Sequence, residues 1–268
     1  MKKFNYIGSA KKTFKIESEA INNLSKQIDK DFVSLCNAIR LNEGKFIIMG
    51  VGKSGHIGQK ISATLSSTGT GSIFIHPTEA AHGDLGLIGK KDIVFLISNS
   101  GETDEIINIL PSLKRLTRKI TSLTSNKKST IAKASDIGIV IKSKEACPLD
   151  LAPTSSTTAA LAFGDALAIA TMQFKKFDKF DFKKIHPSGS LGQQLKTVED
   201  IMLVGNKIPF VNESLKMKKA LKVLSNKKLG TLIIQNKQKK TTGIITDGQI
   251  RRFNQKKLNL SLMTVKEI

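Results

Sequence analysis

Lys45-Phe-Ile-Ile-Met-Gly-Val-Gly-Lys-Ser-Gly55 is the stretch of this chain that decides its fold class. It opens with a short apolar run of strand length, its glycines predict a tight turn, and residues 56–67 continue in a helical pattern. A strand, a glycine turn and a helix in this order form the repeating unit of parallel sheets that are covered by helices. We therefore expect an α/β fold.

The same pattern continues on both sides of this stretch. Short apolar runs predict strands, and longer amphipathic or Ala-rich runs predict helices. The strands are expected at 72–75, 92–97, 119–123 and 137–141, and the helices at 17–41, 103–115 and 155–174. Strands that alternate with helices predict a three-layer parallel sheet of the flavodoxin-like or Rossmann-like kind.

A change in composition near Leu195 predicts a boundary between two domains. We expect a first domain at 1–195 and a smaller α+β unit after it, with a helix at 215–224 and strands at 231–234 and 242–245. This second unit has too few residues to bury a large core by itself. We therefore expect it to pair with another unit.

The net charge of +21 raises the question of an anionic partner. The excess is nearly all Lys, is spread along the chain and does not alternate with aromatic residues, so we expect a solvated surface and no nucleic-acid partner. The chain has only two cysteines, Cys36 and Cys147, and no apolar run approaches the roughly 20 residues of a membrane span. These features favour a cytoplasmic protein without a membrane partner.

Two loops have the composition of anion-binding sites. The loop around Lys53 combines glycines, a helix start and a positive charge, although it lacks the spacing of a nucleotide-binding P-loop. The second loop, Ser98-Asn-Ser-Gly-Glu-Thr103, follows a buried strand and brings three hydroxyls to the start of a helix. We interpret it as a phosphate cradle, because ligands collect at the carboxyl ends of parallel strands. The alternatives are a tight turn for the first loop and a multiply capped helix for the second.

The hydroxyl run Pro153-Thr-Ser-Ser-Thr-Thr158 offers a third helix start, which could also be a simple N-cap. Glu105, Glu145 and His186 lie in or next to loops, and acids, a histidine and a phosphate cradle together suit proton transfer on a sugar phosphate. Residues 76–84 hold two histidines and two acids without metal-ligand spacing. We expect no metal to be required, with His76 at most an adventitious zinc ligand.

Six runs together resemble the arabinose 5-phosphate isomerase family, in which a SIS (sugar isomerase) domain is followed by CBS domains. They are GVGKSGHIGQK at 50–60, HPTEAAHGDLG at 76–86, ISNSGETDEI at 97–106, KEACPLDLAPTSSTTAALAFGDALA at 144–168, HPSGSLGQQL at 186–195 and GIITDGQIRR at 243–252. The resemblance begins at Lys45 and covers nearly all that follows.

The resemblance implies an aldose-ketose isomerase that interconverts D-ribulose 5-phosphate and D-arabinose 5-phosphate through a cis-enediolate, the first step of Kdo biosynthesis for lipopolysaccharide or capsule. It implies a homotetramer with a sugar-phosphate substrate and no cofactor. The catalytic positions would be Lys53, Glu105, Glu145 and His186. The substrate-binding positions would be Ser54, Gly69, Thr70, His76, His82, Ser98, Ser100, Thr103, Ser155 and Ser156.

At the C-terminal end, the resemblance implies a single CBS repeat at 196–262 and the start of a truncated second repeat at 263–268. Thr246 and Asp247 match the positions that contact a nucleotide effector in CBS domains. Two alternatives stay open: another SIS-domain sugar-phosphate isomerase, or a non-catalytic sugar-phosphate-sensing module. Sensing modules of regulators carry an N-terminal helix-turn-helix, whereas we expect only one amphipathic helix before Lys45.

Overall fold

The computed structural model describes residues 4–186, 196–255 and 259–268. It divides into two compact units, Met1–Leu195 and Lys196–Ile268. Residues 187–195 of the HPSGSLGQQL run lie outside the described residues. None of the helices within the described ranges combines the length and the apolar character that crossing a membrane would take.

The first unit is built on a five-stranded parallel sheet with the order β2-β1-β3-β4-β5. The strands are β1 Phe46–Gly50, β2 Ser72–Phe74, β3 Ile93–Ile97, β4 Lys119–Thr124 and β5 Ile137–Val140. Ile48 of β1 lies beside Phe74 of β2 and Phe95 of β3, which fixes the central register. All five carboxyl ends therefore open onto one edge of the sheet.

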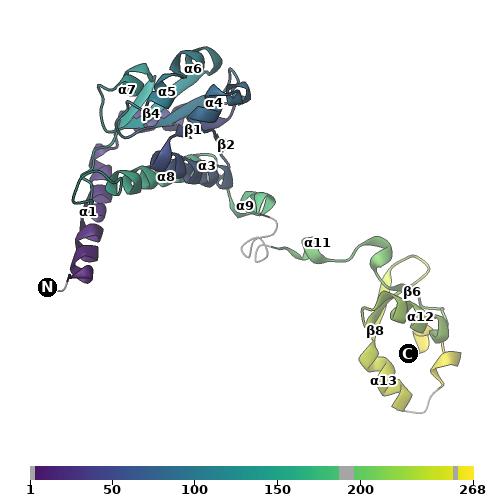
Figure 1. Cartoon of the computed structure of the whole chain (residues 1–268). Helices are drawn as coiled ribbons and strands as arrows, with labels where there is room; N and C mark the ends of the chain where they lie inside the picture. Colours follow the sequence, from purple (N-terminus) through teal and green to yellow (C-terminus); the bar gives the residue numbers. More distant parts are fainter. Residues whose placement is uncertain (1–3, 187–195, 256–258) are drawn as a thin grey trace. The chain divides into compact units, whose positions relative to one another are not determined.

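Helices cover both faces of this sheet (Figure 1). One face carries α1 Tyr6–Gln27, α2 Lys30–Arg40, α3 Gly52–Ser67 and α8 Ser155–Phe174, and the other carries α4 Pro77–Ala81, α5 Asp104–Ile107, α6 Leu110–Leu116 and α7 Thr130–Ala134. Successive residues of a strand serve opposite faces: Ile48 packs with the first set and Ile47 with the second. The predicted three-layer α/β fold is confirmed.

Two of the predicted helices are each interrupted. The pattern expected to form one helix at 17–41 forms α1 and α2, because the Asp29 carboxylate accepts a hydrogen bond from Asp31 N (2.9 Å) and starts a new helix. Two helices therefore precede Lys45, where we expected one. The helix expected at 103–115 is split into α5 and α6, because Pro111 lacks the N–H that a continuous helix needs.

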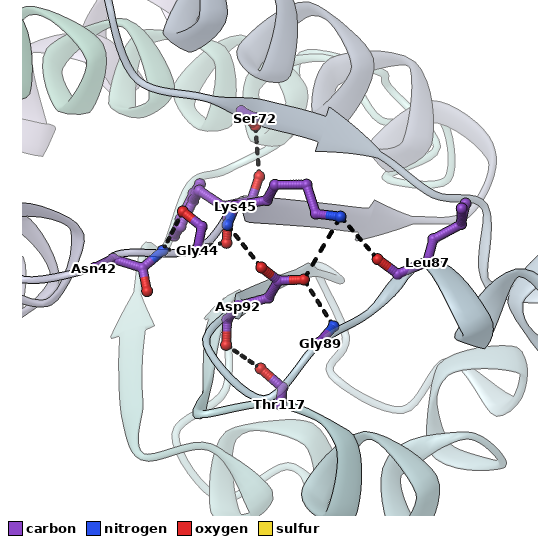
Figure 2. Close-up of polar contacts among 9 residues, drawn as sticks. Asn42, Gly44, Lys45, Ser72, Leu87, Gly89, Asp92 and Thr117 are labelled. Carbon is purple, nitrogen blue, oxygen red and sulfur yellow. Dashed lines mark hydrogen bonds and ion pairs between the residues drawn. The ribbon is translucent and has the colours of Figure 1, made fainter.

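At the amino edge of the sheet, Asp92 joins the starts of β1 and β3 (Figure 2). Its two carboxylate oxygens accept hydrogen bonds from the backbone N–H of Lys45 (2.7 Å) and of Gly89 (2.8 Å), and its carbonyl accepts one from the Thr117 hydroxyl. The Lys45 ammonium lies 3.9 Å from the same carboxylate and donates to the carbonyl of Leu87. The Asp92 side chain is only 6% exposed, whereas the Lys45 side chain is 46% exposed, so one buried carboxylate ties the starts of β1 and β3 together.

The second unit has a three-stranded sheet with the order β6-β7-β8, in which β6 and β7 are parallel and β7 and β8 are antiparallel. Its core joins Val211, Leu232, Ile234 and Ile245 of the strands to α12. The elements are α11 Val198–Ile201, β6 Phe210–Asn212, α12 Met217–Lys227, β7 Thr231–Gln235, β8 Thr241–Thr246 and α13 Asp247–Gln255. Within the described residues, the remaining helices are α9 Lys179–Ile185 and the short 3-10 turns Asp84–Leu87, Gly205–Lys207, Leu260–Leu262 and Val265–Glu267.

One short motif occurs twice in the second unit. Thr197-Val-Glu-Asp-Ile201 and Thr264-Val-Lys-Glu-Ile268 each form a capping box, in which an acidic side chain accepts from both the N–H and the hydroxyl of the threonine. Their surroundings differ. Val265 is buried in the core beside Leu215, whereas Val198 is 75% exposed.

Candidate active site

The carboxyl edge of the five-stranded sheet contains a recess with about 450 Å³ of open space. Its lining combines apolar side chains with several polar ones, which suits a small ligand held by a few hydrogen bonds. The lining residues are Ser54, Ile57, Ile97, Asn99, Leu123, Thr124, Ile141, Pro153, Ser156, Thr157 and Ala160. They come from the ends of β3, β4 and β5 and from the first turns of α3 and α8.

The first turn of α3 is open to an anion. Its N-cap residue, Val51, provides no side-chain acceptor, so the first N–H groups of the helix keep their hydrogen-bonding capacity for a ligand. Ser54 lies in this turn and lines the recess. Lys53 is exposed and forms no hydrogen bond or ion pair with the part of the chain that the structure describes, so its ammonium is available to a ligand.

The hydroxyl loop is shaped by its own side chains. The buried Ser98 hydroxyl lies 2.7 Å from the Thr103 hydroxyl and accepts a hydrogen bond from Gly101 N (3.0 Å). Gly101 has φ +70°, and a Cβ there would lie 2.1 Å from the Ser129 hydroxyl, so only glycine fits. Ser98 and Thr103 thus build the loop, while Ser100 is exposed and its hydroxyl accepts a hydrogen bond from Glu102 N.

Three polar lining residues were not among the predicted site residues: Asn99, Thr124 and Thr157, of which Asn99 and Thr157 lie inside the two hydroxyl runs singled out in the sequence. Asn99 lies inside the hydroxyl loop, but the prediction for this loop considered only side chains with hydroxyl groups. Thr124 ends β4, and the position of a strand end beside the recess could have found it. Glu105 follows the loop on α5, where its side chain is exposed.

Glu145 is bonded to the start of α8. Its carboxylate accepts hydrogen bonds from the Thr154 N–H (2.7 Å), the Thr154 hydroxyl (2.8 Å) and the Ser156 N–H (3.3 Å). Burial raises the pKa of the Glu145 carboxyl, but the hydrogen bonds from Ser156 and Thr154 together outweigh it and hold that pKa below its usual range. In the single chain, these hydrogen bonds therefore favour the ionised form of the Glu145 carboxyl.

Beyond Glu145, two hydroxyls at the same helix start have no partner. Within the described residues, the buried Oγ atoms of Ser155 and Ser156 accept and donate no hydrogen bond. Ser156 also lines the recess. Because a buried hydroxyl without a partner is costly, these two groups indicate that a polar ligand or water completes the site.

The two histidines of the 76–86 run follow β2. His76 Nδ1 accepts a hydrogen bond from Thr78 N (3.2 Å) and caps α4, and His82 is exposed where α4 ends. The ranges 4–186, 196–255 and 259–268 bring together no group of three or more His, Cys, Asp or Glu side chains that could hold a metal ion.

Gly69, Thr70 and His186 lie away from this edge. The turn of Gly69 (φ +87°) and buried Thr70 follows the last turn of α3, and Lys175 Nζ donates to the Gly69 carbonyl and the Thr70 hydroxyl, both at 3.0 Å. His186 is the residue that follows α9, and its ring stacks on the ring of Phe182 with the two ring centroids 3.8 Å apart.

Helix α8 gives the distance between the residues of the recess and the second group, which consists of Gly69, Thr70 and His186. Its first turn carries Ser155 and Ser156 at the carboxyl edge of the sheet, and Lys175 follows its last residue at the Gly69 turn. A helix of 20 residues is about 30 Å long. No five-carbon substrate bridges that length, so one chain does not bring Gly69, Thr70 and His186 to the recess.

In the second unit, Thr246 and Asp247 lie where β8 meets α13. Gln249 Oε1 accepts hydrogen bonds from the N–H (2.9 Å) and the hydroxyl (3.2 Å) of Thr246. The Asp247 N–H donates to the Gly230 carbonyl (3.0 Å), which leaves its carboxylate at the N-terminus of α13.

Comparison with known proteins places the chain in a family. Residues 41–170 match the SIS domain. Arabinose 5-phosphate isomerase KdsD of Pseudomonas aeruginosa is 43% identical over 98% of this chain and 82% of the relative, and KdsD of Escherichia coli K12 is 45% identical over 93% and 76%. The solved structure of E. coli CFT073 c3406 in complex with arabinose 5-phosphate superimposes with a TM-score of 0.67 and 42% identity, over 69% of this chain and 100% of that one. The chain belongs to the arabinose 5-phosphate isomerase family.

Proposed function

We propose that this protein interconverts D-ribulose 5-phosphate and D-arabinose 5-phosphate in the cytoplasm, as the first step of Kdo biosynthesis for lipopolysaccharide or capsule. One observation carries the proposal: a structure in complex with arabinose 5-phosphate is covered over its whole length by this chain at 42% identity. The residues of the recess support it independently, since they suit a small anionic polyol.

The phosphate binds at the rim of the recess, between the first turn of α3 and the loop after β3. The uncapped N–H groups of α3 and the ammonium of Lys53 supply positive potential, and Ser54, Asn99 and Ser100 supply hydrogen bonds. The partnerless hydroxyl of Ser156 then contacts a hydroxyl of the open-chain sugar.

The reaction moves a proton between C1 and C2 through a cis-enediolate. Glu105, Glu145 and His186 are the candidates for base and acid, and Lys53 stabilises the enediolate oxygen. The lowered pKa of Glu145 keeps this carboxyl ionised at neutral pH, so it acts as an acceptor of protons or hydrogen bonds. The donor role then falls to Glu105 or to His186.

A second chain completes the site. Gly69, Thr70 and His186 lie at the amino edge of the sheet, about one length of α8 from the recess. In a homotetramer, the amino edge of one subunit meets the carboxyl edge of another, and each site draws residues from two chains.

For the C-terminal unit we propose a single CBS repeat at 196–262, with 263–268 beginning a second. The order of its elements, a strand, a helix, two strands and a helix, and the recurrence of the Thr197 motif at Thr264 support this division. A nucleotide effector would contact Thr246 and Asp247 at the start of α13.

The decisive experiment is a coupled assay of ribulose 5-phosphate conversion by the purified chain, beside a panel of phosphorylated hexuloses and heptuloses. We expect arabinose 5-phosphate as the product and the highest kcat/KM on the pentulose. A preference for another ketose phosphate would identify a different isomerase, and tight binding of the sugar without turnover would identify a sensing module.

A further inference from the structure

The residues that follow α8 pack against the turn at Gly69. Helix α8 ends in a Schellman motif, in which Lys176 adopts φ +53° and its N–H donates to the Gln173 carbonyl (3.1 Å). The Phe177 N–H donates to the Met172 carbonyl (3.2 Å) in the same motif. The Phe177 ring lies so close to Gly69 that a Cβ there would be 2.4 Å from it. The end of α8 is thus fixed beside this turn.

The side chain of Lys175, the C-cap residue of α8, reaches across to the same turn. Its ammonium donates to the Gly69 carbonyl and to the Thr70 hydroxyl, both at 3.0 Å. Thr70 is only 3% exposed, whereas Lys175 is an exposed residue. At this turn, a ligand held by a second chain therefore meets Lys175, and the two oxygens behind Lys175 fix the position of its ammonium.

The charge of Lys175 has no acidic partner among the described residues. Both of its acceptors are neutral oxygens, and burial of the ammonium against the turn lowers the pKa of the amine. The described residues that line the adjoining groove include a second cation, Arg40, and no acid. An ammonium donates three hydrogen bonds, so one N–H of Lys175 is left for a further acceptor. A positioned cation of this kind suits an anion.

The proposed substrate calls for a second cation. A phosphate monoester carries roughly 1.5 to 2 negative charges at neutral pH. Lys53 supplies one positive charge beside the recess, and the described residues that line the recess add none. In the proposed assembly, the edge that carries Lys175 faces this recess from a second chain.

We infer that Lys175 of one chain binds the substrate phosphate held in the recess of a second chain, with Gly69 and Thr70 of its own chain positioning the ammonium. The inference rests on the proposed function, in which two chains build each site. Lys53 and Lys175 then neutralise the phosphate together, each through charge-assisted hydrogen bonds. The buried Thr70 acts on the substrate only through Lys175.

Steady-state kinetics of variants of the whole chain test this contact. Lys175→Met removes the charge and Lys175→Arg keeps it. Lys176→Met is the matched control, since Lys176 is the next residue, is exposed and forms no side-chain hydrogen bond with the described residues. We expect Lys175→Met to raise KM at least about tenfold with kcat within about threefold of wild type, because substrate and transition state both lose one charge-assisted hydrogen bond. Lys175→Arg should recover most of the affinity, and Lys176→Met should match wild type.

Calorimetry with inorganic phosphate measures the same loss without turnover. Lys175→Met should weaken phosphate binding about tenfold. This measurement stands even where the chain prefers another ketose phosphate, a result that would change the proposed function alone. Native phosphate affinity in Lys175→Met, or an equal loss in Lys176→Met, would overturn the inference. A lowered kcat with native KM would also overturn it, since Lys175 would then serve only the fold.

Mixed oligomers identify the chain that supplies Lys175. When Lys53→Ala and His186→Ala chains are mixed, a recovered site combines the recess of the His186→Ala chain with the Gly69 edge of the Lys53→Ala chain. Adding Lys175→Met to the Lys53→Ala chain should raise the KM of the recovered activity, whereas adding it to the His186→Ala chain should leave that KM unchanged. Any other pattern, including no recovery of activity, would place Lys175 outside the site of a second chain and overturn the inference.

Discussion

The carboxylate of Glu145 has a structural role at the start of α8, apart from any role in the reaction. It accepts three hydrogen bonds at the start of α8, and these hold its pKa below the usual range although burial acts in the opposite direction. A group with a lowered pKa in the folded state stabilises the protein above its unfolded pKa, and the contribution is lost as the pH falls through the folded pKa.

Glu145→Gln should therefore lower Tm at neutral pH and lose its effect in acid. The amide keeps one acceptor oxygen, so the variant isolates the charge. We expect the difference in Tm between wild type and variant to be constant down to about pH 4.3, the usual value for Glu, and to shrink below it. Thermal melts at a series of pH values measure this, and a difference that persists unchanged to pH 3 would contradict it.

Glu105 and His186 are the remaining candidates for proton transfer in the proposed reaction. Glu105→Gln and His186→Asn should each lower kcat by at least about 100-fold, the lower range for a positioned acid or base. Lys114→Ala, which alters an exposed position on α6, is the control and should keep its turnover. Near-native kcat in both variants would remove these residues from the mechanism.

Gly69 combines a left-handed conformation with a tight contact. Gly69→Ala should lower Tm, because φ +87° costs about 1–2 kcal/mol for any other residue and the new Cβ would lie 2.4 Å from the Phe177 ring. Adding Phe177→Ala should recover only the steric part, judged against Phe177→Ala alone. Full recovery in the double variant would show that backbone strain is absent.

At the scale of elements, Asp92 joins β1, β3 and the turn at Gly89. Asp92→Ala removes the acceptor of two partly buried hydrogen bonds, those from the N–H groups of Lys45 and Gly89, at about 0.5–1.5 kcal/mol each, which predicts a fall in Tm of roughly 2–12 °C. Asp92→Asn keeps one acceptor and should fall less. Lys91→Ala is the control: it breaks the neighbouring ion pair with Glu43, in which both side chains are 72% exposed, and should shift Tm by only about 1–2 °C.

Which elements could be predicted depended on their length. The strands of the parallel sheet and the 20-residue helix α8 carry enough apolar positions for periodicity to show them. Helices α4, α7 and α9 have only five to seven residues and escaped prediction, since so few residues complete hardly two turns. The break at Asp29 was missed because the apolar period continues through it, while the cap depends on one side-chain hydrogen bond.

At the scale of the whole molecule, the sequence again predicted some positions of the site and not others. Residues at strand ends, such as Ser98 and Ser100, could be predicted to share one edge, because all strands of the sheet run parallel. Gly69 directly precedes the strand predicted at 72–75, which already places it at the amino edge, whereas the position of His186 could not be predicted because α9 escaped prediction. The length of α8, from Ser155 at one edge to Lys175 at the other, gives the distance between the two groups of residues.

This separation predicts recovery of activity in mixed oligomers. Lys53→Ala and His186→Ala should each be inactive, yet chains mixed after reversible dissociation should regain activity, because some sites then combine an intact Lys53 edge with an intact His186 edge. Random assembly in pairs gives about a quarter of wild-type activity per site. Mixing Lys53→Ala with Glu145→Ala, two lesions at the same edge, should regain none. Recovery in neither mixture would place the whole site in one chain.

In a living cell, the separation of the two groups of site residues along α8 predicts which pairs of mutant alleles complement each other. In a strain whose growth requires this activity, two copies of the gene, each disabled, would support growth together when their lesions fall at opposite ends of α8, and would fail when both lesions fall at one end. A table of such pairings, scored only by survival, would sort the residues of the first unit by the edge they occupy. The pattern of complementation would then show, without a structure, which residues lie at each end of α8.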